Sequence, residues 1–245
     1  MNVEPPIQAR LLDLAKVDAE LARIAHRRKT LPEQVEVSRL EGERSARKDA
    51  AVAVEIIIDD LDRDIAKLEG EVEGVRKRED RDRKLLAGGS VGAKQLTELE
   101  HELETLARRQ GNLEDELLEV MERREASAAD HQHAGAQLSQ AEVELTTALR
   151  QRDDAVADLD VAEKRCAGEY STLVASLPAD LMAAYGRQRA QTGTGAALLQ
   201  ARRCGACRLE LDRGEIARIT ASAPELVIRC PECNVILVRT KESGL

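Results

Sequence analysis

The cysteines near the C-terminal end are the residues whose type and spacing point to chemistry. Cys204 and Cys207 form one Cys-x-x-Cys pair, and Cys230 and Cys233 form a second pair after 22 intervening residues. Each pair, placed on a tight turn, directs two sulfur atoms at one point, and two such turns together make a tetrahedral four-thiolate cage. We therefore predict that these four side chains hold one structural Zn²⁺ ion.

Two other roles for these cysteines are less favoured. A closed four-thiolate site leaves no coordination position for a substrate, which disfavours a catalytic zinc. Oxidation of the pairs to disulfides would make a redox sensor and is the weaker alternative. The sequence offers no nucleophile–base pair elsewhere, so we expect a protein that is not an enzyme. The fifth cysteine, Cys166, falls on an apolar helix position and is interpreted as a small buried core residue.

Arginines surround the two cysteine pairs and are the second group of candidate functional residues. Residues 187–245 hold ten Lys or Arg and six Asp or Glu, although a zinc–tetrathiolate centre would reduce that surplus to about +2. We predict that these arginines contact the phosphate backbone of nucleic acid, which makes the binding salt-sensitive. Since the segment has no aromatic residue on which a base could stack, the binding is expected to be weakly sequence-specific. Ordinary solvated arginines are an equally weighted alternative. The candidates are Arg202, Arg203, Arg208, Arg218, Arg229 and Arg239.

The rest of the chain has the composition of a coiled coil. Its 245 residues include two tyrosines, no Phe and no Trp, and 34% are charged. Aromatic side chains dominate the cores of thick globular domains, so such a core is not expected. Residues 1–186 hold 27 basic and 40 acidic residues, which makes this part acidic. Long helices rich in Leu, Val, Ala and charged residues fit these numbers.

Apolar residues recur at alternating spacings of three and four along two stretches of similar length, 7–86 and 92–178. Glycines in the segment 87–92 mark a reversal of direction. We therefore predict an antiparallel coiled-coil hairpin in which facing residue numbers sum to about 178. Pro32 interrupts the first stretch, and the repeat changes phase there, so a kink is expected near Pro32.

The C-terminal part is predicted to be a small β domain. Pro178 ends the second long helix, and a short helix is expected over 179–190, with Asp212 as the N-cap of another helical turn. The predicted organisation is a hairpin over 1–178, a short helix and linker over 179–195, and a C4 zinc ribbon over 196–245. The fold class is mainly α with a small zinc ribbon.

The sequence also bears on the location of the protein. MNVEPPIQAR has no basic flank followed by an apolar run, and no stretch of eighteen apolar residues is present. We expect a cytoplasmic protein with no membrane contact, in a reducing compartment where cysteine pairs bind metal rather than form disulfides.

Several segments resemble the bacterial C4-type zinc-ribbon proteins with an N-terminal coiled-coil hairpin, over nearly the whole chain. They are Ala9–Leu31 ending in TLP, VGAKQLTELEHELETL, LEDELLEVMER, AAYGRQR, CGAC, CPEC and VILV. The resemblance implies zinc ligation by Cys204, Cys207, Cys230 and Cys233. Some relatives are implicated in binding an alternative RNA polymerase sigma factor or messenger RNA, so it also implies an adaptor linked to transcription or RNA.

Two functions follow as expectations. The first is a non-enzymatic zinc-binding adaptor that contacts RNA, DNA or a transcription-associated protein through the ribbon. The second is a protein-interaction scaffold or chaperone that grips a helical partner through the acidic coiled coil. No small-molecule substrate is expected, and the sequence leaves the oligomeric state open.

Overall fold

A computed structural model describes residues 1–89 and 92–245 of the chain. These residues form two compact units. Unit 1 comprises Met1–Pro32 and Gln151–Leu245, and unit 2 comprises Glu33–Arg150. Two residues of the predicted turn over 87–92, Ser90 and Val91, lie outside the described residues.

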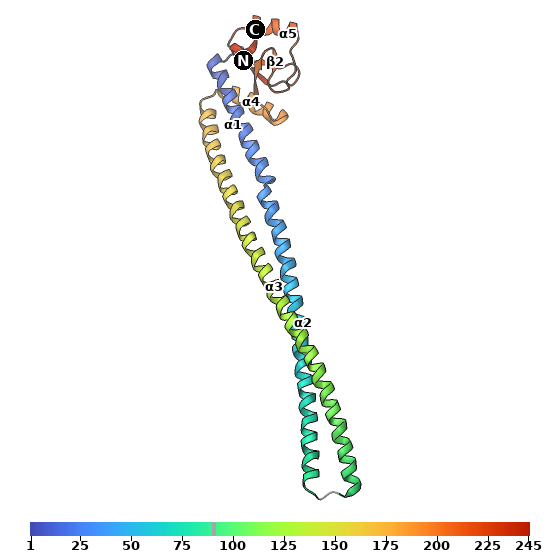
Figure 1. Ribbon diagram of the computed structural model, residues 1–245. Coiled ribbons are helices and arrows are strands. Elements are labelled where there is room, and N and C mark those ends of the chain that lie inside the picture. Colours follow the sequence, from blue (N-terminus) through green and yellow to red (C-terminus); the bar gives the residue numbers. More distant parts are fainter. Residues whose placement is uncertain (90–91) are drawn as a thin grey trace. The chain divides into compact units, whose positions relative to one another are not determined.

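Unit 2 is built from helix α2 (Pro32–Ala87) and the first part of helix α3 (Ala93–Ala175), which run antiparallel (Figure 1). The predicted coiled-coil hairpin is confirmed. Side chains at alternating three- and four-residue spacings form its seam. One seam cluster consists of Leu61, Ile65, Leu68, Val72, Val75, Leu106, Leu113, Leu117 and Val120.

Ion pairs between the two helices fix the register of unit 2 and correct the prediction. Arg124 Nε lies 2.9 Å from Asp62 Oδ1, whereas the predicted register places Arg124 opposite residue 54. Helix α2 ends at Ala87 and α3 begins at Ala93, each one residue later than expected, which raises the sum of facing residue numbers to about 180. The pair of Arg109 Nη2 and Glu71 Oε2, 3.8 Å apart, agrees with this sum.

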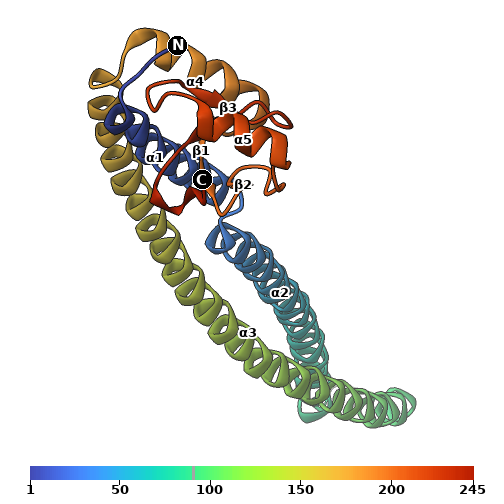
Figure 2. The same ribbon diagram turned by 90° about the horizontal axis from the view of Figure 1, so that it is seen from above.

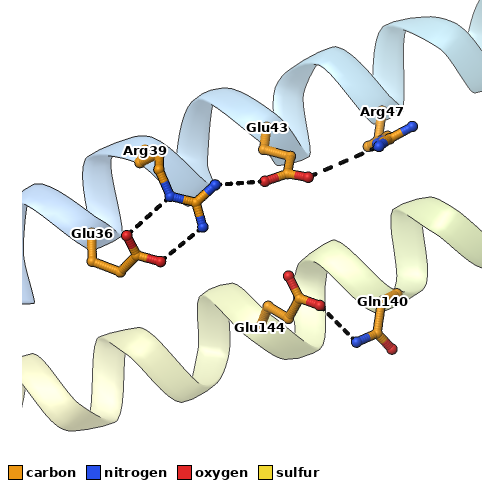
Figure 3. Close-up of polar contacts among 6 residues, drawn as sticks. All are labelled: Glu36, Arg39, Glu43, Arg47, Gln140 and Glu144. Carbon is orange, nitrogen blue, oxygen red and sulfur yellow. Dashed lines mark hydrogen bonds and ion pairs between the residues drawn. The ribbon is translucent and has the colours of Figure 1, made fainter.

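Most charged side chains in Figure 3 are paired along their own helix rather than across the seam. On α2, Arg39 Nη2 lies 2.8 Å from Glu36 Oε1, and Arg39 Nη1 lies 3.0 Å from Glu43 Oε2. The hydrogen bond from Arg39 lowers the pKa of Glu36. Exposed pairs of this kind contribute little to stability, so the apolar seam carries most of it.

The predicted kink near Pro32 is a complete break between two helices. Helix α1 (Pro5–Lys29) ends, Thr30 and Leu31 are not helical, and α2 begins at Pro32. Proline has no backbone N–H and its ring crowds the preceding turn, which ends one helix and suits the first position of the next.

Unit 1 combines helical segments with the ribbon (Figure 2). Helix α4 (Ala179–Thr192) leads into β1 (Ala196–Gln200) and β2 (Arg203–Cys204). Helix α5 (Arg213–Ala221), β3 (Ile228–Arg229), β4 (Ile236–Val238) and a 3₁₀ turn (Lys241–Ser243) follow. The strand order is β2-β1-β4-β3, with β1 and β4 parallel and the other pairs antiparallel. Asp212 caps α5, as predicted, by accepting a hydrogen bond from Glu215 N.

The first three residues of the chain join the ribbon, which sequence patterns did not reveal. Val3 N donates to Glu225 O at 2.7 Å, and Val227 N donates to Met1 O at 3.0 Å. The buried side chain of Gln8 strengthens this junction, since its Nε2 donates to the carbonyl oxygens of Val3, Pro224 and Glu225. The predicted boundaries at 178 and 195 therefore fall inside unit 1.

The apolar core of unit 1 lies where α1, α4 and the sheet meet. It contains Leu11, Leu14, Leu181, Tyr185 and Ile236, each at most 1% exposed. Within the part of the chain that is described, no helix is long and apolar enough to span a membrane.

The contact between Gly195 and Tyr185 generates a stability prediction. A Cβ atom on Gly195 would lie 2.5 Å from Tyr185 Cδ2, a distance that forces the ring or strand to move. Gly195→Ala is expected to lower the free energy of unfolding by about 1–3 kcal/mol, measured by urea unfolding followed by circular dichroism.

Gly186→Ala is the matched control for that measurement. A Cβ atom on Gly186 meets nothing within 4 Å, and the residue lies inside α4, where alanine is favoured by up to about 1 kcal/mol. Equal effects of the two substitutions would contradict the packing explanation.

Candidate metal centre and its surroundings

The four predicted cysteine ligands come together in unit 1. Their sulfur atoms all lie within 4.8 Å of one another. Cys204 Sγ is 3.8 Å from Cys233 Sγ, and Cys207 Sγ is 3.9 Å from Cys230 Sγ. A tetrahedral centre with Zn–S bonds of ~2.3 Å requires sulfur atoms about 3.8 Å apart, so this donor set fits Zn²⁺. The ion, once bound, has four thiolate ligands and a structural role.

Two turns with the same hydrogen-bond pattern position these sulfurs. In the first turn, Cys204 N donates to Leu209 O and Arg208 N donates to Cys204 O. In the second turn, Cys230 N donates to Val235 O and Asn234 N donates to Cys230 O. The fifth residue of each turn is left-handed, with φ of +67° at Arg208 and +61° at Asn234.

The glycine in the first Cys-x-x-Cys pair permits a close approach to β1. Gly205 N donates to Leu198 O at 2.9 Å, and a Cβ atom on Gly205 would lie 2.7 Å from the same oxygen. Any other residue at this position would push the first turn away from the strand. The sheet thus places the first turn relative to the second.

The thiols differ in environment. Burial raises the pKa of Cys204 to about 12 and also raises the pKa of Cys233. The backbone N–H of Leu209 lowers the pKa of the more exposed Cys207. Zinc binding therefore releases protons from thiols that resist ionisation on their own.

Helix α4 connects the metal centre to the helical part of unit 1. The Gln188 side chain, 2% exposed, donates from Nε2 to Cys233 O at 2.8 Å. One turn away, Tyr185 Oη donates to Asp18 Oδ2 of α1 at 2.6 Å, and Arg189 Nη2 lies 3.0 Å from Asp18 Oδ1. Burial, followed by the hydrogen bond to Asp18, raises the pKa of Tyr185.

Sequence reasoning did not assign roles to Gln188 or Tyr185. A signal was present in the segment AAYGRQR, which combines one of the two tyrosines with a glutamine on a short helix. Spacing alone did not indicate that both side chains point inward.

The six arginines proposed for nucleic-acid contact have different environments. Arg239 donates to five backbone carbonyl oxygens, including those of Ile219 and Ser222, and so caps the C-terminal end of α5. Burial lowers its pKa. Its guanidinium is largely occupied by these bonds.

Three more of the arginines have partners within the ribbon. Arg203 pairs with Glu210 at 2.8 Å, and Arg218 pairs with Glu215 at 2.6 Å. Arg229 Nη1 donates to Asn234 O at 3.3 Å.

Arg202 and Arg208 are the remaining two, and both are exposed beside the first cysteine turn. Arg202 makes one long hydrogen bond from Nε to Gly244 O, at 3.3 Å. Arg208 has no side-chain partner among the described residues.

Cys166, which does not belong to the cysteine cluster, is a buried core residue, as predicted. It is fully buried in unit 1 with Val17 and Ile24 of α1.

Comparison with protein families gives two matches. Residues 14–193 match the CT398-like coiled coil hairpin domain, and residues 203–237 match the C4-type zinc ribbon domain. The first match covers most of the helical part of the chain, and the second contains all four cysteine ligands.

Similar proteins occur in mycobacteria. The uncharacterized protein Rv2229c of Mycobacterium tuberculosis is 46% identical over 232 residues, which cover 95% of each chain. The uncharacterized protein ML1638 of Mycobacterium leprae is 39% identical over 93% of this chain and 98% of its own.

Two solved structures have the same fold. A protein from Mycobacterium smegmatis superposes with a TM-score of 0.86 at 50% identity, covering 98% of this chain and 100% of the other. CT398 from Chlamydia trachomatis superposes with a TM-score of 0.65 at 14% identity, covering 95% and 97%.

The first prediction for the site concerns metal content. Cys207→Ser is expected to reduce bound zinc from one ion per chain to a small fraction, because a hydroxyl is a poor replacement for a thiolate. Elemental analysis after gel filtration with a chelator measures this. Cys166→Ala should retain one zinc per chain, and equal loss in both variants would contradict the assigned ligand set.

The second prediction concerns Gln188. Gln188→Ala is expected to accelerate zinc transfer to a chromogenic chelator by about tenfold, since groups that support a ligand segment affect metal retention on this scale. The matched control is Gln191→Ala, which alters an exposed glutamine at the end of the same helix. Identical transfer rates for wild type and Gln188→Ala would show that α4 does not support the centre.

Proposed function

We propose that this chain, which belongs to the family of CT398-like coiled-coil hairpin proteins with a C4-type zinc ribbon, is a non-enzymatic adaptor whose ribbon binds the phosphate backbone of single-stranded RNA. In this proposal the zinc ion holds the binding surface in shape and takes no part in chemistry. Four thiolates complete a tetrahedral coordination shell, which supports a structural ion over a catalytic one.

The backbone conformation at two arginines carries the proposal. Arg202 shares a left-handed conformation with Ala201 in the turn between β1 and β2, with φ of +64° and +44°, and Arg208 has φ of +67°. This region costs a residue with a Cβ atom about 1–2 kcal/mol. The second cysteine turn places Asn234, a residue that tolerates this conformation, at the position equivalent to Arg208. An arginine in a strained and exposed position is favoured where its side chain has a role outside the fold.

The location of these arginines also suits a polyanion. Arg202 precedes the first cysteine turn and Arg208 is its fifth residue. Neither forms an ion pair with a carboxylate among the described residues. Arg203 lies between them in sequence but is paired with Glu210. Arginine binds phosphate through several N–H groups in a fixed plane, which favours contact with a nucleic-acid backbone.

RNA binding by a strain-relieving variant tests this proposal. The double variant Arg202→Asn/Arg208→Asn removes both guanidinium groups. Asparagine tolerates positive φ better than arginine, so the free energy of unfolding of the variant should equal or exceed that of wild type. We expect weaker binding to a fluorescein-labelled single-stranded RNA in fluorescence anisotropy. The slope of log K against log salt should fall by about 0.7 for each phosphate that the variant no longer neutralises.

The matched control removes two exposed arginines from unit 2, as Arg108→Gln/Arg123→Gln. It changes net charge by the same amount and should bind RNA like wild type. Absence of RNA binding by the zinc-loaded wild type at low salt would refute the proposal, as would equal weakening in both double variants. If the protein binds duplex DNA as tightly as RNA, the proposed ligand becomes nucleic acid in general.

A further inference from the structure

The seam of unit 2 changes character toward the end of α2. Leu68, Val72 and Val75 are buried apolar residues at alternating spacings of four and three. The next two positions in this series are Glu79 and Asp82, which are only 4% and 1% exposed. Charged residues thus occupy two successive core positions of a coiled coil.

These two carboxylates are incompletely paired. Glu79 Oε2 lies 2.9 Å from Arg83 Nη2, and Asp82 Oδ1 lies 3.1 Å from Arg81 Nε. The other oxygen of each group, Glu79 Oε1 and Asp82 Oδ2, is buried without a hydrogen-bond donor among the described residues. A buried acceptor without a donor destabilises the folded state, particularly when it is charged.

Leucines on α3 lie opposite these acids in the register of the seam. The apolar series of α3 runs from Leu106 back through Leu103, Leu99 and Leu96. Leu103 and Leu99 are half-buried, and Leu96 is 40% exposed. Helix α2 has no apolar side chain between Val75 and Leu85, so this part of the seam has fewer apolar partners for the α3 leucines than the part before it.

We propose that the tip segment, defined as residues 75–86 of α2 and 96–106 of α3, binds an amphipathic helix of a partner protein that carries Lys or Arg within a leucine stripe. The cations of such a helix supply donors to Glu79 and Asp82, and its leucines cover those of α3.

The partner helix enters by parting α2 from α3. The two carboxylate oxygens are covered, so a donor reaches them only when the seam opens. In the layers of the seam that contain Glu79 and Asp82, leucines of α3 face carboxylates. Separating the helices at these two layers costs less free energy than at the apolar layers between Leu61 and Val75. The tip segment is separate from the ribbon arginines, and a helix bound there gives the scaffold alternative a location and a partner chemistry.

A designed peptide tests the tip segment in the full-length, zinc-loaded protein. The probe is a labelled helical peptide of about 28 residues with leucine at its core positions and lysine at two central ones. A control peptide carries glutamate at those two positions. We expect the lysine peptide to bind at least about tenfold more tightly than the glutamate peptide in fluorescence anisotropy.

Two double variants locate the binding. Glu79→Leu/Asp82→Leu completes the apolar seam, so it should raise the thermal midpoint of unfolding and weaken lysine-peptide binding at least about tenfold. Glu79→Gln/Asp82→Asn keeps the shape of the side chains and should abolish the preference for lysine over glutamate. Asp80→Asn/Glu98→Gln, which neutralises two exposed carboxylates, should bind like wild type.

Several results would overturn the proposal. The first is equal binding of the two peptides, and the second is unchanged peptide binding by Glu79→Leu/Asp82→Leu. The third is self-association of the wild-type protein that is lost in Glu79→Leu/Asp82→Leu, because the occupant of the tip segment would then be a second copy of this chain. Arg202→Asn/Arg208→Asn should bind the lysine peptide normally. Failure at the tip segment and failure of RNA binding are therefore separate outcomes.

Discussion

The convergence of four sulfur atoms is the constraint on which the ribbon depends. The strands around it are two to five residues long and too small to form a stable core without the metal. The contacts that hold the sulfurs come from several directions. Gly205 lets one turn approach β1, and Gln188 binds the carbonyl group of Cys233 from α4. Zinc ligation and the packing of α4 therefore reinforce each other.

The two cysteine turns illustrate how one backbone design serves different purposes. Both turns repeat the same two hydrogen bonds and the same left-handed residue. Asn234 satisfies that conformation at low energetic cost, and Arg229 donates to its carbonyl group. Arg208 adopts it with no comparable support. The second turn is thus consistent with a structural role, while the first combines structure with an exposed positive charge.

Local patterns in the sequence predicted the parts of the fold that depend on local physics. The leucine repeats indicated the hairpin, Pro32 indicated the helix break, and the cysteine spacing indicated the metal ligands. Each of these signals is contained in a few neighbouring residues or in one regular repeat. Contacts between distant segments could not be predicted in this way. The pairing of Val3 with Glu225 requires knowledge of the tertiary structure. Nothing in the spacing of Arg239 shows that it caps a helix, because its acceptors are backbone groups of another element.

The pairing of the first residues with the ribbon has a consequence for the order of events during synthesis. Helices α2 and α3 complete most of unit 2 from residues 33–150, so their contacts are available while the chain is still growing. Met1 and Val3 must wait for Glu225 and Val227, which are translated more than two hundred residues later. The pairing of the first residues with the ribbon thus forms last, after synthesis of nearly the whole chain, whereas the contacts of α1 with α3 are available earlier.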